Sequence, residues 1–319
     1  MMGFKIVYMG TPEFAVEGLR SLKNSGIEIA AVVTATDKPA GRGQKLTPSA
    51  VKEFALENHI PVLQPEKLKD PEFIAALKEI NADLFVVVAF RMLPEMVWNM
   101  PKYGTINLHA SLLPQYRGAA PINWAVINGE KESGVTTFFI RQEIDTGHII
   151  EQRKVEISDT DTAGILHDKL MVTGAELLVK TVTAIRDGKS SSTPQESLIT
   201  EGTTLKSASK IFKEDCHINW NRSTTEVYNL IRGLSPYPAA FSIWKQVNKE
   251  DNTLKIFSSE KDSKCGKPGS IETDDKSYLR VFTSDGSLLL KELQQAGKKK
   301  MTIEEFLRGT KIDHASTLC

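Results

Sequence analysis

Three polar side chains, Asn107, His109 and Asp145, have types and spacing that point to chemistry. Asn107 and His109 lie two residues apart in the stretch TINLH, so on a β-strand they would project from the same face. Asp145 lies in the turn-like segment EIDTG. Acyl transfer to an amine passes through a tetrahedral oxyanion, to which an asparagine amide can donate a hydrogen bond. A histidine can accept the amine proton, and a carboxylate can orient it, so the set fits acyl transfer without a covalent intermediate.

Each of these residues also has a structural explanation that the sequence leaves open. His109 could be a buried histidine with satisfied hydrogen bonds, Asn107 could cap the loop that follows it, and Asp145 could be an ordinary turn aspartate. Arg42 stands between two glycines, where it could be a solvated charge or a mobile cation over a substrate. No group of histidine, cysteine and acidic residues has the spacing of a metal site, so we expect no metal.

The elements that position these residues follow from alternating apolar runs and amphipathic stretches. Apolar runs at residues 5–10, 27–34, 84–90 and 105–109 predict strands, and amphipathic stretches between them predict helices. Thr11 is expected to cap the first helix. Strands that alternate with helices are typical of a parallel α/β sheet, whose carboxyl edge binds ligands. The first turn, MGTPEFAVEG, lacks the pattern G-x-G-x-x-G, which argues against a dinucleotide site.

A change of composition predicts two domains. Residues 188–206 are rich in Gly, Ser, Thr and Pro, and we interpret them as a linker. The linker separates a first domain at residues 1–187 from a second at residues 207–319. The second contains short strand-like segments broken by polar turns, which is typical of a small β-barrel.

Overall composition excludes several classes of protein. The 319 residues include 40 basic and 40 acidic side chains, so charge alone does not indicate nucleic-acid binding. The three cysteines are widely spaced and odd in number, which favours reduced thiols in a cytoplasmic protein. No run of 18 apolar residues and no signal-peptide pattern is present, so we expect no membrane association. Nothing in the sequence requires more than a monomer.

Residues 106–150 resemble the core of the 10-formyltetrahydrofolate-dependent formyltransferase family; their sequence is INLHASLLPQYRGAAPINWAVINGEKESGVTTFFIRQEIDTGHII. They contain the family's Asn-x-His pair at Asn107 and His109, its SLLP loop, and its aspartate at Asp145. The resemblance implies that these three residues are catalytic and that the co-substrate is 10-formyltetrahydrofolate. It also implies that the folate binds beside the SLLP loop, which comprises Ser111, Leu112, Leu113 and Pro114.

Other segments resemble the members of this family that act on methionyl-tRNA: MGTPEFAVEGL, DKPAGRGQKLTPSAVKEFA, IRGLSPYPAAF and LLLKELQQAGKKKMTIEEFLRG. This resemblance implies a doubly wound, mostly parallel, Rossmann-like N-terminal catalytic domain and a smaller OB-like β-barrel that binds tRNA. It implies transfer of the formyl group to the free amino group of initiator methionyl-tRNA, for translation initiation. The loop that carries Arg42 is expected to contact the acceptor end of the tRNA.

Two other functions remain open at this point. The first is formyl transfer to a small amine, such as an amino-sugar nucleotide; such an enzyme would not need the C-terminal module at residues 233–310. The second is folate or tRNA binding without catalysis, although binding alone would not require Asn107, His109 and Asp145 together.

Overall fold

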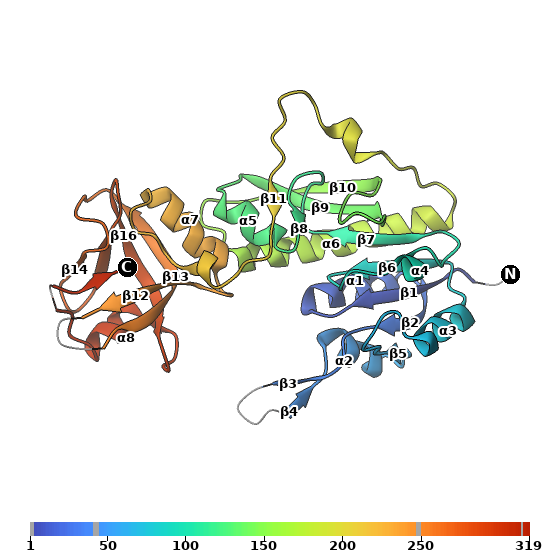
Figure 1. Cartoon of the computed structure of the whole chain (residues 1–319), viewed down its shortest axis with the longest axis horizontal. Coiled ribbons are helices and arrows are strands. Elements are labelled where there is room, and N and C mark those ends of the chain that lie inside the picture. The colour runs from blue at the N-terminus through green and yellow to red at the C-terminus, as the bar shows by residue number, and fades with distance from the viewer. Residues whose placement is uncertain (1–2, 41–44, 247–249, 314) are drawn as a thin grey trace. The chain divides into compact units, whose positions relative to one another are not determined.

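The structure is a computed structural model that describes residues 3–40, 45–246, 250–313 and 315–319. The chain forms two compact units, each of which is described by itself (Figure 1). The first unit consists of Met1–Gly118, Ser133–Glu156 and His167–Ala208. The second unit consists of Ala119–Glu132, Ile157–Leu166 and Ser209–Cys319.

The first unit is built on a seven-stranded sheet with the order β10-β9-β7-β6-β1-β2-β5. The five strands from β7 to β5 are parallel, and β9 runs antiparallel to β7. Strands β2 and β5 follow β1 in the chain and lie on one side of it in the sheet, whereas the next strands, β6 and β7, lie on the other side of β1. The predicted doubly wound, mostly parallel fold is therefore confirmed, with its switch point between β1 and β6. The strands are β1 (Lys5–Gly10), β2 (Glu28–Val33), β5 (Val62–Leu63), β6 (Leu84–Val88), β7 (Thr105–His109), β9 (Glu132–Phe139) and β10 (Ile149–Glu156).

Helices cover both faces of this sheet, which explains why its central strands are apolar on both sides. On one face, Val7, Phe85 and Val87 share a buried cluster with Phe73 of α3 (Pro71–Ile80) and Val97 of α4 (Glu95–Trp98). We call this the α3–α4 face. The other main helices of this unit are α1 (Glu13–Asn24), α2 (Ala50–Glu57) and most of α6 (Ala163–Arg186).

Tyr8 shows how closely α1 packs on the opposite face. Its hydroxyl is fully buried and donates a 2.6 Å hydrogen bond to the carbonyl of Ala15. Burial raises the pKa of Tyr8 well above its ordinary value, so the hydroxyl stays a donor. A Cβ added at Gly18 would lie 3.0 Å from the Tyr8 hydroxyl and 3.1 Å from Leu178 of α6. The absence of a side chain at Gly18 therefore lets α1 approach both the sheet and α6.

Two local predictions differ from the structure. Thr11 does not cap α1, because the N-cap is Pro12 and no side chain bonds to the first turn. The apolar run at residues 84–90 forms a strand only as far as Val88, since Ala89 takes a left-handed conformation with φ of 47°. The chain therefore turns away from the sheet two residues earlier than its hydrophobicity suggests.

The second unit contains an antiparallel sheet that almost closes into a barrel. Its strand order is β14-β15-β16-β13-β12-β18, and β17 also pairs with β16. Ser270, next to β14, bridges Thr317 of β18, so the two edges meet. The predicted β-barrel is confirmed. The strands are β12 (Ala240–Lys245), β13 (Asn252–Asp262), β14 (Ile271–Thr273), β15 (Leu279–Phe282), β16 (Ser287–Gln295), β17 (Met301–Thr302) and β18 (Thr317–Leu318).

The barrel unit also contains residues from the middle of the chain. Helix α5 (Pro121–Ile127) packs on α7 (Thr224–Leu234), and the Asn123 amide donates to the Gly233 carbonyl over 2.8 Å. The Arg232 guanidinium donates to the Asp161 carbonyl over 2.9 Å. Within the barrel unit, long-range hydrogen bonds therefore join α5, and Asp161 just before α6, to α7. Helix α8 (Ile303–Arg308) closes its core, where Phe306 meets the Trp244 ring edge-on at 5.8 Å.

Candidate active site

Asn107 and His109 lie at the C-terminal end of β7, as their spacing predicts. Asn107 stands opposite Val87 of β6, so its side chain belongs to the α3–α4 face. His109, two residues on, projects from the same face and is 7% exposed. Within the described part of the chain, the half-buried Asn107 amide has no hydrogen-bond partner. Its two N–H groups are therefore free to meet a bound molecule.

His109 has a different environment at each ring nitrogen. Its Nε2 lies 2.9 Å from the carbonyl oxygen of Tyr116. A carbonyl only accepts, so Nε2 carries the proton in this arrangement. The other nitrogen, Nδ1, lies 3.8 Å from Asp145 Oδ2. In the neutral ring Nδ1 therefore holds the lone pair, and on protonation it would face a carboxylate.

Asp145 approaches His109 from the connection between β9 and β10. Its backbone is left-handed, with φ of 55°, and its side chain is 15% exposed. Asp145 Oδ2 accepts a 3.0 Å hydrogen bond from the Gly118 backbone N–H. The structure thus brings together two residues that are 36 positions apart and fixes the carboxylate with a backbone donor.

The loop at residues 111–114 follows β7 and is held by two polar side chains of neighbouring strands. Thr136 Oγ1 donates to the Ser111 carbonyl over 2.6 Å and accepts from the Leu113 N–H over 3.2 Å. The Gln152 amide donates to the Leu113 carbonyl over 2.8 Å and to Thr136 Oγ1 over 2.9 Å. Leu113 and Pro114 are buried, whereas Leu112 remains half-exposed. These bonds give the loop one defined shape beside His109.

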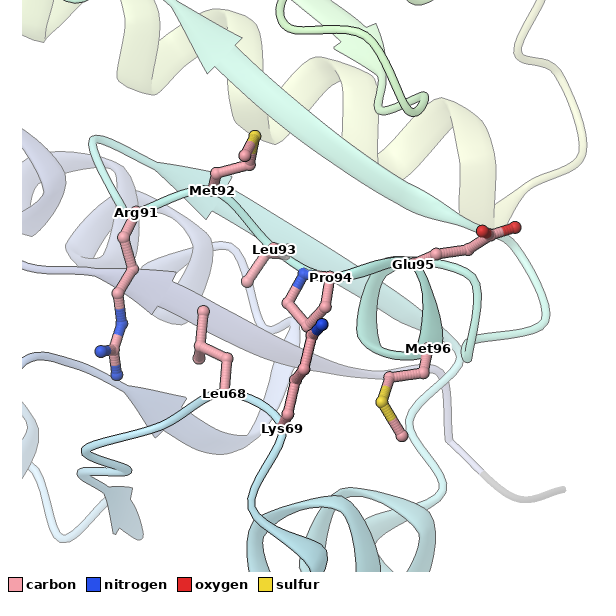
Figure 2. Close-up of a pocket in the computed structure, with 8 residues that line it drawn as sticks. All are labelled: Leu68, Lys69, Arg91, Met92, Leu93, Pro94, Glu95 and Met96. Atoms are coloured by element: carbon pink, nitrogen blue, oxygen red, sulfur yellow. The ribbon is translucent and has the colours of Figure 1, made fainter.

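A cavity of about 760 Å³ opens on the same unit (Figure 2). Its lining side chains come from two segments that follow β5 and β6, on either side of the switch point. Leu68 and Leu93 also belong to the buried cluster of the α3–α4 face, the face that carries Asn107. Arg91 donates to the carbonyls of Glu66 and Pro65 and so ties the two segments together. The lining residues are Leu68, Lys69, Arg91, Met92, Leu93, Pro94, Glu95 and Met96, and residues 111–114 are not among them.

Arg42 lies outside the described residues. The strands on either side, β3 (Lys38–Ala40) and β4 (Lys45–Thr47), pair antiparallel. Asp37, just before β3, accepts from the Lys52 ammonium over 2.7 Å and from the Gln64 amide over 2.9 Å. These hydrogen bonds, first from Lys52 and then from Gln64, hold the pKa of the Asp37 carboxyl below its ordinary value.

The described residues contain no helix that is long and apolar enough to cross a membrane. They also contain no group of three or more histidine, cysteine and acidic residues that could hold a metal ion.

The chain matches known protein families along most of its length. The formyl transferase family model matches residues 4–182, and the model of the formyl transferase C-terminal domain matches residues 210–311. The methionyl-tRNA formyltransferase of Bacteroides fragilis is 56% identical over 98% of this chain and 96% of its own length. The chain belongs to the methionyl-tRNA formyltransferase family. The relative of that name from Flavobacterium johnsoniae is 47% identical over 97% of each chain.

Solved structures agree on the fold. The N-formyltransferase from Helicobacter canadensis, in complex with folinic acid and dTDP-3-aminofucose, superposes with a TM-score of 0.62. The match covers 94% of this chain and 100% of that chain, at 23% identity. At 23% identity, the match shows a shared fold and does not indicate which amine this chain formylates.

Several residues that shape the site were not indicated by the sequence. Thr136 and Gln152 are single polar positions within strands, and Gly118 is one of 21 glycines. Their importance comes from contacts with residues 16 to 39 positions away. No local pattern of hydrophobicity or turn residues could have distinguished them.

Replacing Gly118 by alanine is expected to lower the free energy of unfolding by about 1–3 kcal/mol. Gly118 has φ of 126°, and an added Cβ would lie 2.4 Å from the carbonyl oxygen of Ala208, which pairs with it. Gly26→Ala is the matched control, because Gly26 also has positive φ but no atom within 4 Å of the added Cβ. Denaturant unfolding of both variants measures the difference. Equal destabilisation would show that the close approach to Ala208 is not the constraint.

Proposed function

We propose that this chain transfers the formyl group of 10-formyltetrahydrofolate to the free amino group of initiator methionyl-tRNA, in translation initiation. The observation that carries the proposal is a 56% identity to a methionyl-tRNA formyltransferase across almost the whole chain. Asn107, His109 and Asp145 support it because their types fit acyl transfer to an amine. The sheet edge at the end of β7 is also where α/β folds bind ligands.

In the proposed reaction, the methionyl amine attacks the formyl carbon and forms a tetrahedral oxyanion. The Asn107 amide donates to that oxyanion. His109 Nδ1 holds a lone pair, because Nε2 donates to the Tyr116 carbonyl, and in the proposed step Nδ1 accepts the proton of the attacking amine. The imidazolium that forms faces Asp145, 3.8 Å away, which stabilises it.

The oxyanion then collapses and breaks the bond between the formyl carbon and N10 of the folate. His109 returns its proton to N10 as the bond breaks. The products are formylmethionyl-tRNA and tetrahydrofolate, and His109 is again neutral. No covalent bond to the protein forms in this reaction, because Asn107, His109 and Asp145 do not include a serine or cysteine nucleophile.

We place the folate beside residues 111–114 and extend it into the cavity lined by residues 91–96. A folate combines flat aromatic rings with a carboxylate tail, and the cavity combines leucine, methionine and proline side chains with the cations Arg91 and Lys69. The cavity and Asn107 lie on the same face of the sheet, so a molecule in the cavity could present its reactive carbon to the end of β7.

We assign catalysis to residues 1–187 and tRNA binding to residues 207–319, joined by residues 188–206. An OB-like barrel is a common platform for nucleic acids, which supports this role for the second unit. We further propose that Arg42 contacts the acceptor end of the tRNA. We also propose that the enzyme acts as a monomer in the cytoplasm, where aminoacylated initiator tRNA is used.

A formyl-transfer assay tests the proposed function. Purified protein and 10-formyltetrahydrofolate are combined with initiator methionyl-tRNA, elongator methionyl-tRNA or an amino-sugar nucleotide, and kcat/KM is measured for each. We expect the initiator tRNA to give the highest value. A higher kcat/KM with the amino sugar would assign the chain to small amines, and folate binding without any turnover would make it a binding protein.

A further inference from the structure

Gln195 is buried in a part of the chain that is otherwise exposed. Every residue at positions 186–194 and 196–207 is exposed, whereas Gln195 has no exposed surface. Gln195 begins the short 3₁₀ helix η1 (Gln195–Leu198) within the segment at residues 188–206. Burying one polar side chain from a solvated segment is unfavourable unless its hydrogen bonds are satisfied.

All four hydrogen-bonding positions of the Gln195 amide are used. Its Oε1 accepts from Arg117 Nε over 3.0 Å and from Arg117 Nη2 over 2.7 Å. Its Nε2 donates to the Asp145 carbonyl and to the Gly147 carbonyl, each over 2.8 Å. An amide has two lone pairs and two N–H groups at these atoms, so this set determines its orientation completely.

These bonds converge on Asp145. Gln195 holds the main chain of the Asp145 loop, and Arg117 is followed directly by Gly118, whose N–H holds the Asp145 carboxylate. Aspartate adopts a left-handed backbone more readily than most residues with a side chain, and the bonds from Gln195 to the Asp145 and Gly147 carbonyls hold Asp145 in it. The main chain of Asp145 is therefore connected through Gln195 to Arg117, and its carboxylate is held by the adjacent Gly118.

We propose that Gln195 is a positioning residue that keeps Asp145 in place beside His109. It does not contact the reacting atoms and acts through Asp145. The segment at residues 188–206 then does more than join two domains, because it supplies part of the support for the catalytic set. The role of Asp145 in this inference rests on the proposed function.

Steady-state kinetics of the full-length protein gives the first test. Gln195→Ala is expected to lower kcat for formyl transfer by about 10- to 100-fold, with smaller changes in KM for folate and tRNA, because displacing a catalytic group by about 1 Å can cost that much. Gln195→Glu can still accept from Arg117 but offers no donor to the two carbonyls, so a comparable loss is expected. Ser197→Ala is the matched control, since the Ser197 hydroxyl in the same helix donates to the nearby Pro194 carbonyl.

A double-mutant cycle with Asp145→Asn separates positioning from general stabilisation. If Gln195 acts through Asp145, Gln195→Ala should lower the rate of the Asp145→Asn protein by less than about twofold, because the interaction that it supports is already lost. An undiminished loss in that background, or wild-type kcat in Gln195→Ala, would overturn the inference.

Amide hydrogen exchange tests the same inference without activity and so separates it from the proposed function. The Gly118 N–H donates to Asp145, and in Gln195→Ala it should exchange about tenfold faster than in the wild type and in Ser197→Ala. Unchanged exchange would show that Asp145 does not depend on Gln195, whichever amine the wild type formylates.

Discussion

Replacing His109 by alanine is expected to lower kcat for formyl transfer by about 10²–10⁴-fold, the usual contribution of one positioned proton-transfer group. In the proposed reaction, His109 accepts the proton of the attacking amine and returns it to the folate. Its Nδ1 is available for this because Nε2 is engaged with the Tyr116 carbonyl. Single-turnover formylation of methionyl-tRNA with saturating folate measures the chemical step directly.

His167→Ala is a matched control for this variant. His167 on α6 also pairs with an aspartate, Asp168, over 2.9 Å, but that pair is exposed and has no place in the proposed reaction. Its loss should change kcat by less than about twofold. Circular dichroism verifies that both variants fold. A folded His109→Ala protein with near-wild-type turnover would remove His109 from the mechanism.

Replacing Asp145 by asparagine is expected to lower kcat by a similar factor, about 10²–10⁴-fold, with little change in folate affinity. Asparagine tolerates the left-handed backbone at this position, and its amide oxygen can still accept from the Gly118 N–H. What it cannot do is stabilise a positively charged His109. The variant therefore removes the charge while it keeps the shape of the loop.

Rates over a range of pH and folate binding by titration test this separation. Asp168→Asn serves as the control, since it neutralises the exposed aspartate that pairs with His167. If Asp145→Asn turns over like the wild type at every pH, Asp145 is only a turn residue. If folate affinity falls as steeply as kcat, Asp145 contributes to binding rather than to proton transfer.

Much of the scaffold was predictable from the sequence, because burial imposes local patterns. Continuous apolar runs such as residues 84–90 are required of strands that helices cover on both faces, so the central strands were correctly predicted. The alternation of side chains along a strand predicts that Asn107 and His109 project together. The details of chain turns were less predictable, as Thr11 and Ala89 show, since they depend on backbone conformations that several residue types can adopt.

The sequence therefore predicted the type and order of the elements and, through resemblance to a family, it predicted Asn107, His109 and Asp145 as the catalytic residues. The folded structure was needed to show how Asp145 reaches His109, that Gly118 and Gln195 hold it, and that α5 packs with the barrel unit. The composition of residues 188–206 is that of a linker and does not distinguish Gln195 from its solvated neighbours. Hydrophobic periodicity can be read from the sequence because it depends on residues that are close together in the chain. The hydrogen bond from Gln195 to the Asp145 carbonyl joins residues 50 positions apart, so it forms only when folding brings these residues together.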